Sequence, residues 1–199
     1  VMKKLLCSFL VTLALSGQTA VVLLDDDWDD GDRTDTNLPE EAAWFGSVAS
    51  GAATLSAASN ALTANVRMPD SLSSRMWITH FTPAGSPAEL ALNETLKLTL
   101  SFVPRGVTTS NAASRGFRIG LFNFSEPGAA RVSGDGFSTG TGGGAPGANV
   151  TGYMLNMNFG QTFTAGSPLE LMKRTDTANI NLMGATAVFT RLSTGGGNV

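Results

Sequence analysis

The fold class is decided by Arg115-Gly-Phe-Arg-Ile-Gly-Leu-Phe-Asn-Phe124 and by Gly152-Tyr-Met-Leu-Asn-Met-Asn-Phe159. Both stretches alternate, and a period of two indicates a strand with one buried face. The polar side chains Arg118, Asn156 and Asn158 are expected on the solvent side. The side chains expected to face the core are Phe117, Ile119, Leu121, Tyr153, Leu155, Met157 and Phe159.

The rest of the sequence adds further short strands. The clearest alternation is Glu94-Thr-Leu-Lys-Leu-Thr-Leu-Ser-Phe102, which places its leucines and Phe102 inward and its polar residues outward. Further strands are expected near 44–45, 54–56, 61–66, 75–81, 169–174 and 185–192, of which the first is weak and 75–81 is stronger. No helical pattern of useful length follows residue 20. The sequence therefore predicts an all-β fold, an antiparallel β-sandwich.

The composition suits a secreted protein. Only 15% of the 199 residues are charged and 23 are glycine, which fits an extracellular all-β protein better than a cytosolic enzyme. The length predicts one domain. The net charge of −3, without a cluster of basic residues, argues against nucleic acid as a partner.

Residues 1–20 have the features of a secretory signal peptide. Lys3 and Lys4 form a positive region, Leu5 to Leu15 a short apolar region, and Ser16 to Ala20 offer small residues for cleavage. The apolar run is too short to span a membrane, and a buried N-terminal strand is the alternative. The expected organisation is a leader over 1–20 and a single domain over 21–199, with no transmembrane segment after cleavage. We therefore expect the protein to be secreted or at the cell surface.

An acidic run, Asp25-Asp-Asp-Trp-Asp-Asp-Gly-Asp32, opens the expected mature chain. Ca²⁺ takes several carboxylate and carbonyl oxygens, so the run is a candidate structural calcium site. The candidate ligands are Asp25, Asp27, Asp29 and Asp30. The spacing does not fit an EF-hand, and a solvated acidic turn is the alternative.

The acidic run, the following Arg33-Thr-Asp-Thr-Asn-Leu-Pro39, Phe117-Arg-Ile-Gly-Leu-Phe122 and Gly152-Tyr153 together resemble a group of secreted bacterial surface proteins. That group is similar to concanavalin A-like, laminin-G-like jelly rolls. The resemblance implies two packed antiparallel sheets, a concave face often used for glycans, and in some members a calcium ion at the rim. Such jelly rolls usually end with one or two further strands, so the chain is compatible with a domain truncated at its C-terminal strands.

Nothing in the sequence supports catalysis. Gly136-Phe-Ser-Thr-Gly140 matches a nucleophile-elbow pattern, but a strand and helix do not flank it and the single histidine, His80, lies upstream. Concanavalin-like hydrolases need two carboxyls close together, whereas Glu94 and Glu170 lie on separate expected strands. We therefore expect no enzymatic activity, and a polysaccharide-cleaving enzyme is the weakest of the functions considered.

Binding is the remaining class of function. Planar polar side chains bond sugar hydroxyls, and aromatic rings stack on sugar rings. Arg118, Asn156 and Asn158 are the candidate polar contacts, with Phe137 of the glycine-rich loop as the candidate stacking residue. The alternative is that these polar residues are ordinary solvent-facing positions on an antiparallel sheet. The sequence predicts a carbohydrate-binding module, with a structural cell-surface or matrix protein as the competing function.

Overall fold

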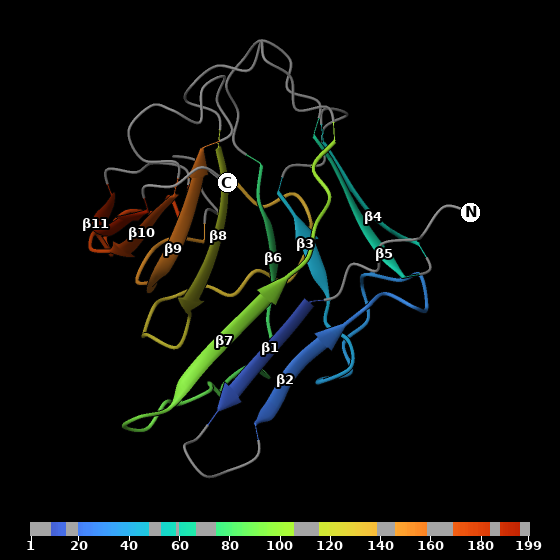
Figure 1. The fold of residues 1–199 in the computed structure, drawn as a ribbon, viewed down its shortest axis with the longest axis horizontal. Helices are drawn as coiled ribbons and strands as arrows, with labels where there is room; N and C mark the ends of the chain where they lie inside the picture. Colours follow the sequence, from blue (N-terminus) through green and yellow to red (C-terminus); the bar gives the residue numbers. More distant parts are fainter. Residues whose placement is uncertain are drawn as a thin grey trace. The chain divides into compact units, whose positions relative to one another are not determined.

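The computed structural model describes residues 9–14, 20–47, 53–58, 60–66, 75–105, 116–138, 146–158, 169–183 and 188–195. Within these ranges the elements are strands, and no helix is long and apolar enough to cross a membrane (Figure 1). The prediction of an all-β fold is confirmed for this part of the chain. The strands are β1 (Phe9–Ala14), β2 (Val21–Asp26), β3 (Trp44–Gly46), β4 (Ala53–Ala58), β5 (Ala61–Val66), β6 (Trp77–Thr79), β7 (Thr95–Leu100), β8 (Gly116–Asn123), β9 (Thr151–Asn158), β10 (Leu169–Arg174) and β11 (Phe189–Gly195).

The chain folds as two compact units. The first comprises Val1–Val103 with Val132–Phe137, and the second comprises Pro104–Arg131 with Ser138–Val199. The paired strands within each unit are antiparallel. A single domain over 21–199 stays a prediction.

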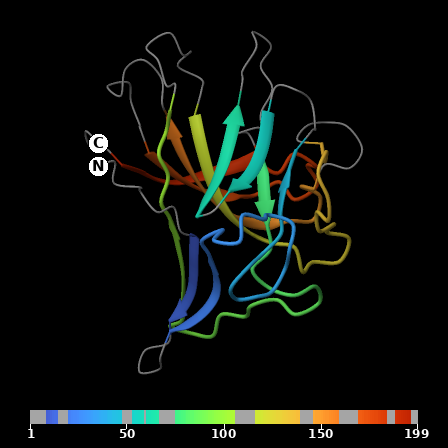
Figure 2. The same ribbon diagram turned by 90° about the vertical axis from the view of Figure 1, so that its right-hand side faces the viewer.

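The first unit contains a three-stranded sheet in the order β2-β1-β7. In β1, Phe9 pairs with Asp26 on one side and with Leu100 on the other. Figures 1 and 2 both show β1, in dark blue, between the other two strands. β1 lies inside the predicted signal peptide. Cleavage is a processing event that the fold of the full chain does not test, so the leader stays a prediction.

The core of the first unit is built around two tryptophans. Trp28 and Trp44 are buried, and their ring centroids lie 5.8 Å apart with the rings tilted by 58°. Leu24 of β2 and Ala42 complete the buried cluster. The partly buried side chains packed against it include the three leucines of β7, Leu96, Leu98 and Leu100. The inward side of that strand is therefore the one predicted from its alternation, whereas Phe102 lies beyond β7 and is exposed.

Arg33 joins three distant segments of the first unit. Its guanidinium donates to the carbonyl oxygen of Trp44 at 2.6 Å, to that of Leu55 at 3.0 Å, and in a bidentate manner to Asp135 at 2.6 and 3.1 Å. Asp135 also accepts the backbone N–H of Gly46 at 2.8 Å. Two parallel charge-assisted bonds make this a stronger contact than a single ion pair. The contact ties the segment 132–137 to β3 and β4.

We expect Asp135→Asn to lower the free energy of unfolding at neutral pH, because it removes the charge that pairs with Arg33. The loss should be only about 1 kcal/mol, because Asp135 is partly exposed and solvent screens the pair. The hydrogen bonds from Arg33 lower the pKa of Asp135 below its ordinary value of 3.8. A carboxyl whose pKa is lowered on folding stabilises the protein above that ordinary value, and its contribution is lost as the pH falls through the folded-state pKa. Urea unfolding of the wild type and of Asp135→Asn, measured from neutral pH down into acid, gives the difference in their free energies of unfolding. This difference should shrink as the pH falls. A difference that persists at the lowest pH would contradict the charge argument.

The second unit holds a four-stranded antiparallel sheet in the order β11-β10-β9-β8. Its register aligns Ile119 with Leu155 and Leu155 with Leu171, while Arg118 and Glu170 both pair with Asn156. The predictions of strands at β8 and β9 are confirmed, so neighbouring residues such as Arg118 and Ile119 lie on opposite faces. We refer to the two sides of this sheet as the Leu155 face and the Asn156 face.

The more deeply buried side of this sheet is the opposite of the predicted one, although Ile119 and Leu155 on the predicted side are partly buried. On the Asn156 face Met154 is only 1% exposed and clusters with Met172, Val188 and Phe189. On the Leu155 face, which was expected to be the core side, Tyr153 is 49% exposed and Leu171 41% exposed. The long apolar side chains of the two methionines fill the space between the sheet and the segments that cover it. Strand periodicity does not reveal which face those segments cover.

Candidate functional site: the polar row of the second sheet

Four polar side chains form a continuous row across the second sheet. Arg118 Nε donates to Asn156 Oδ1 at 3.1 Å, and Asn156 Nδ2 donates to Glu170 Oε2 at 3.0 Å. Arg191 extends the row through an ion pair with the other oxygen of Glu170. Each side chain comes from a different strand, so the backbone pairing of β8, β9, β10 and β11 positions them together. We call Arg118, Asn156, Glu170 and Arg191 the polar row.

The polar row runs from a buried interior to an exposed end. Glu170 is buried, whereas the side chain of Arg191, on the last strand of the sheet, is 55% exposed. Arg118 is partly buried and its NH1 also donates to the carbonyl oxygen of Met183 at 2.5 Å. Burial lowers the pKa of Arg118, while the charge of Glu170 acts to raise it. The row thus presents two guanidinium cations around one carboxylate and one amide.

At its exposed end, where the side chain of Arg191 is accessible, the row can contact planar or polyhydroxylated ligands. Guanidinium groups present several N–H donors in a fixed plane, and the amide and carboxylate supply acceptors beside them. The row has a single carboxylate, whereas glycoside hydrolysis generally requires a pair. The donors and acceptors of the row suit binding through hydrogen bonds.

Arg174 organises the loops over the same face. Its buried guanidinium lies 6.0 Å from the ring centroid of Phe189, and burial lowers its pKa. It donates to five backbone carbonyl oxygens, those of Gly147 at 2.9 Å, Val150 at 2.9 Å, Asn179 at 2.5 Å, Asn181 at 2.7 Å and Leu182 at 3.0 Å. These carbonyls belong to the segments 147–150 and 179–182, which are in tight contact, because a Cβ on Gly147 would lie 2.4 Å from the carbonyl oxygen of Ile180. Arg174 therefore holds the segments 147–150 and 179–182 over the Asn156 face.

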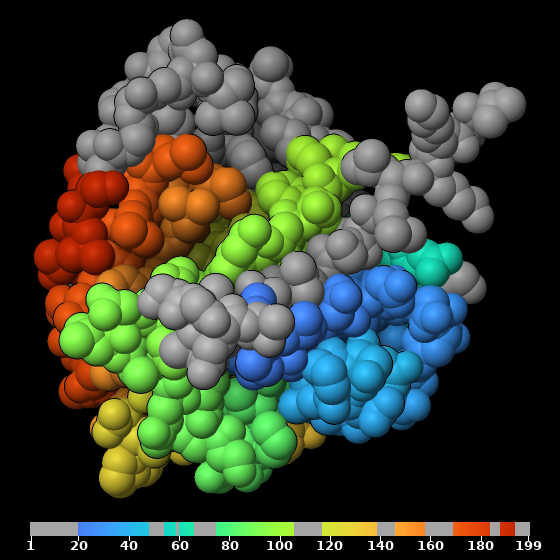
Figure 3. Space-filling model, turned by 60° about the horizontal axis from the view of Figure 1, so that its bottom comes forward, coloured from blue at the N-terminus to red at the C-terminus, as the bar shows by residue number. Residues whose placement is uncertain are grey.

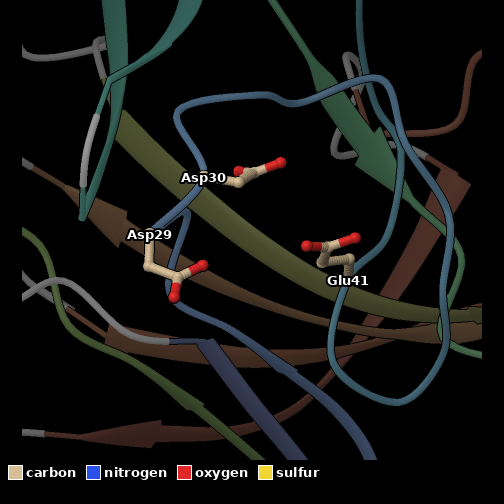
Figure 4. Close-up of side chains that lie close together, drawn as sticks. All are labelled: Asp29, Asp30 and Glu41. Carbon is tan, nitrogen blue, oxygen red and sulfur yellow. The ribbon is translucent and has the colours of Figure 1, made fainter.

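A second cluster of polar groups lies in the first unit. The carboxylates of Asp29, Asp30 and Glu41 can bring their oxygens within 4.8 Å of one another. Figure 4 shows the three side chains directed toward a common space, and the surrounding segment appears at the surface in Figure 3, in blue and light blue. Asp30 Oδ1 also accepts the backbone N–H of Asp32 at 2.8 Å, which shapes the turn. Oxygen ligands at this spacing suit a hard cation such as Ca²⁺.

The electrostatics of this region reflect its crowded carboxylates. Partial desolvation and then the negative charges led by Asp30 raise the pKa of Glu41. Nearby, Asp26 is buried and accepts Trp44 Nε1–H at 2.9 Å and the backbone N–H of Trp28 at 3.2 Å. Burial raises the pKa of Asp26, and these hydrogen bonds oppose the shift. Asp26 is thus part of the core, while the cluster at the surface could hold a cation.

The structure brings together some of the predicted site residues. Arg118 and Asn156 are hydrogen-bonded partners, whereas Phe137 belongs to the first unit, where it forms a bridge with Ser47. The side chain of Asn158 lies outside the described residues. Asp29 and Asp30 are joined in one cluster, which does not include Asp25 or Asp27.

Sequence reasoning missed three residues of these sites. Glu170 and Arg191 enter the polar row through strand pairing, and a pairing register cannot be read from a single strand. Glu41 joins the acidic cluster because the chain turns back after Asp30. The only sequence signal for Glu170 was its alternation with Leu169 and Leu171 in the run 169–174.

Comparison of the chain with protein-family models, curated proteins and solved structures gave no match.

Proposed function

We propose that the protein is a secreted, non-enzymatic carbohydrate-binding module of the concanavalin A-like jelly-roll type. The observation that carries this proposal is the polar row, in which guanidinium, amide and carboxylate groups from four strands lie in line. Groups of this kind bond the hydroxyl and acidic substituents of saccharides. The all-β fold and the low content of charged residues support the same class of protein.

The polar row can be tested at its exposed end. We expect Arg191→Ala to weaken glycan binding at least about tenfold, because it removes donors from the accessible part of the row and frees Glu170. A glycan array followed by titration of the best ligand gives the readout. The matched control is Lys173→Ala, an exposed cation on the Leu155 face of the same sheet. If Arg191→Ala and Lys173→Ala bound the glycan equally well, the polar row would not be part of the binding site. Release of reducing ends from the ligand would contradict a non-enzymatic function.

A structural surface or matrix protein is the second candidate function. The Leu155 face supports it, because Tyr153 and Leu171 are exposed there and Leu192 of β11 is exposed as well. Neighbouring exposed apolar side chains are typical of protein contacts. This function predicts no ligand on a broad glycan array and an association in sedimentation experiments that Leu171→Asp abolishes.

We also propose a structural role for Ca²⁺ at the acidic cluster. We expect added Ca²⁺ to raise the melting temperature, because a ligand that binds only the folded state stabilises it. Asp30→Asn and Glu41→Gln should each remove this effect, while Asp35→Asn, an exposed carboxyl outside the cluster, should keep it. Identical melting curves of the wild type in Ca²⁺ and in chelator would mean that the carboxylates form only a solvated turn.

A further inference from the structure

The central strand of the first unit's sheet is the one that export would remove. β1 spans Phe9–Ala14, inside the leader predicted over 1–20. In the sheet β2 and β7 pair with β1 and not with each other. Cleavage after β1 would leave their two inner edges facing each other at about 9.5 Å, twice the usual spacing of paired strands. The mature protein would then carry a slot one strand wide.

This slot borders the core of the first unit. Val11 of β1 pairs with Leu24 on β2 and with Leu98 on β7, and both leucines belong to the cluster around Trp28 and Trp44. Without a strand in the slot, the backbone N–H and C=O groups of both inner edges lose their partners, and water reaches the side of the core. An open edge beside apolar side chains is the feature to which partner strands add.

We propose that the slot between β2 and β7 is a strand-acceptor site that takes an extended segment of a partner polypeptide once the leader has been removed. This inference rests on the proposed export. The strand now in the slot indicates the chemistry of the occupant, which spans about six residues antiparallel to both neighbours. Directly paired residues share a face of a sheet. Positions paired with Leu96, Leu98 and Leu100 must therefore be apolar, as Leu13, Val11 and Phe9 are.

The acceptor can be tested on the full chain. A protease recognition sequence inserted between Gly17 and Gln18 allows the folded protein to be cut after β1. We expect the freed N-terminal peptide to remain bound, so that both fragments elute together and appear as one complex in native mass spectrometry. A labelled synthetic peptide of residues 7–16, added in excess, should exchange into the slot.

Two control peptides give the experiment its specificity. A Val11→Pro peptide should bind at least about tenfold more weakly, because proline removes a backbone donor that a strand paired on both sides requires. A Ser16→Pro peptide, altered outside β1, should bind like the unaltered one. If the cut protein aggregates as its peptide leaves, excess unaltered peptide should prevent the aggregation.

Three results would overturn the acceptor site. The first is that the freed peptide dissociates and the melting temperature of the cut protein does not change. The second is that the Val11→Pro peptide binds as tightly as the unaltered peptide. The third is that the cut protein aggregates even in excess unaltered peptide. Export is tested separately by the mass of the secreted protein. Secreted protein that still carries residues 1–20 would contradict leader removal without affecting the measured affinity of the slot for the peptide.

Discussion

Replacing Arg174 with methionine is expected to lower the free energy of unfolding of the protein by about 3–5 kcal/mol. The guanidinium is buried and donates to five backbone carbonyl oxygens in the segments 147–150 and 179–182. Methionine matches much of its volume but leaves the buried carbonyls of Gly147, Val150 and Leu182 without a donor. Urea unfolding, followed by a probe in the second unit, measures the loss.

Two further variants separate the hydrogen bonds from the charge. Arg174→Lys keeps the charge, but the three donors of an ammonium sit on one nitrogen and cannot serve all five carbonyls, so most of the loss should remain. Lys173→Met removes an exposed cation from the other face of the same strand and should change the stability by no more than about 0.5 kcal/mol. If Arg174→Met behaved like Lys173→Met, Arg174 would not be holding the loops.

Met154→Ala is expected to cost about 2–5 kcal/mol of stability, the range for deleting a fully buried large apolar side chain. Met154 is almost inaccessible and packs in the cluster with Met172 and Phe189. Alanine would leave a cavity between the sheet and the segments over it. The matched control is Tyr153→Ala, one residue away on the Leu155 face and half exposed, which should cost about 1 kcal/mol or less.

The two variants together test which face of the second sheet is buried. Thermal or urea unfolding of both, under the same conditions, gives the comparison. A large cost for Tyr153→Ala with a small cost for Met154→Ala would restore the originally predicted orientation. It would also place Asn156 and the polar row on the open side of the sheet.

Strand positions were the most predictable part of this fold. Alternation identified β7, β8 and β9 to within one or two residues at most ends, because a period of two follows directly from the backbone geometry of a strand. The inward leucines of β7 were also predicted correctly. β1 was not predicted as a strand, because an apolar run after two lysines has the features of a leader as well as those of a buried strand.

The candidate sites were predictable only within single strands. Arg118 and Asn156 were expected on one side of a sheet, and the register pairs them directly. Glu170 and Arg191 complete the row through pairing with β10 and β11, and Glu41 joins Asp29 and Asp30 through a turn of the chain. Such contacts depend on residues distant in the sequence, and a single-strand pattern carries no information about them.

By itself, the sequence determined the all-β class and which residues of β8 and β9 share a face, because local backbone geometry sets both. Only the tertiary structure decided which face is buried. Arg174 anchors two loops over the Asn156 face through backbone carbonyls, which any residue type supplies, so the sequence has no pattern that marks them. Met154 is therefore in the core while Tyr153 is exposed, because the side of a strand that is buried depends on what packs against it.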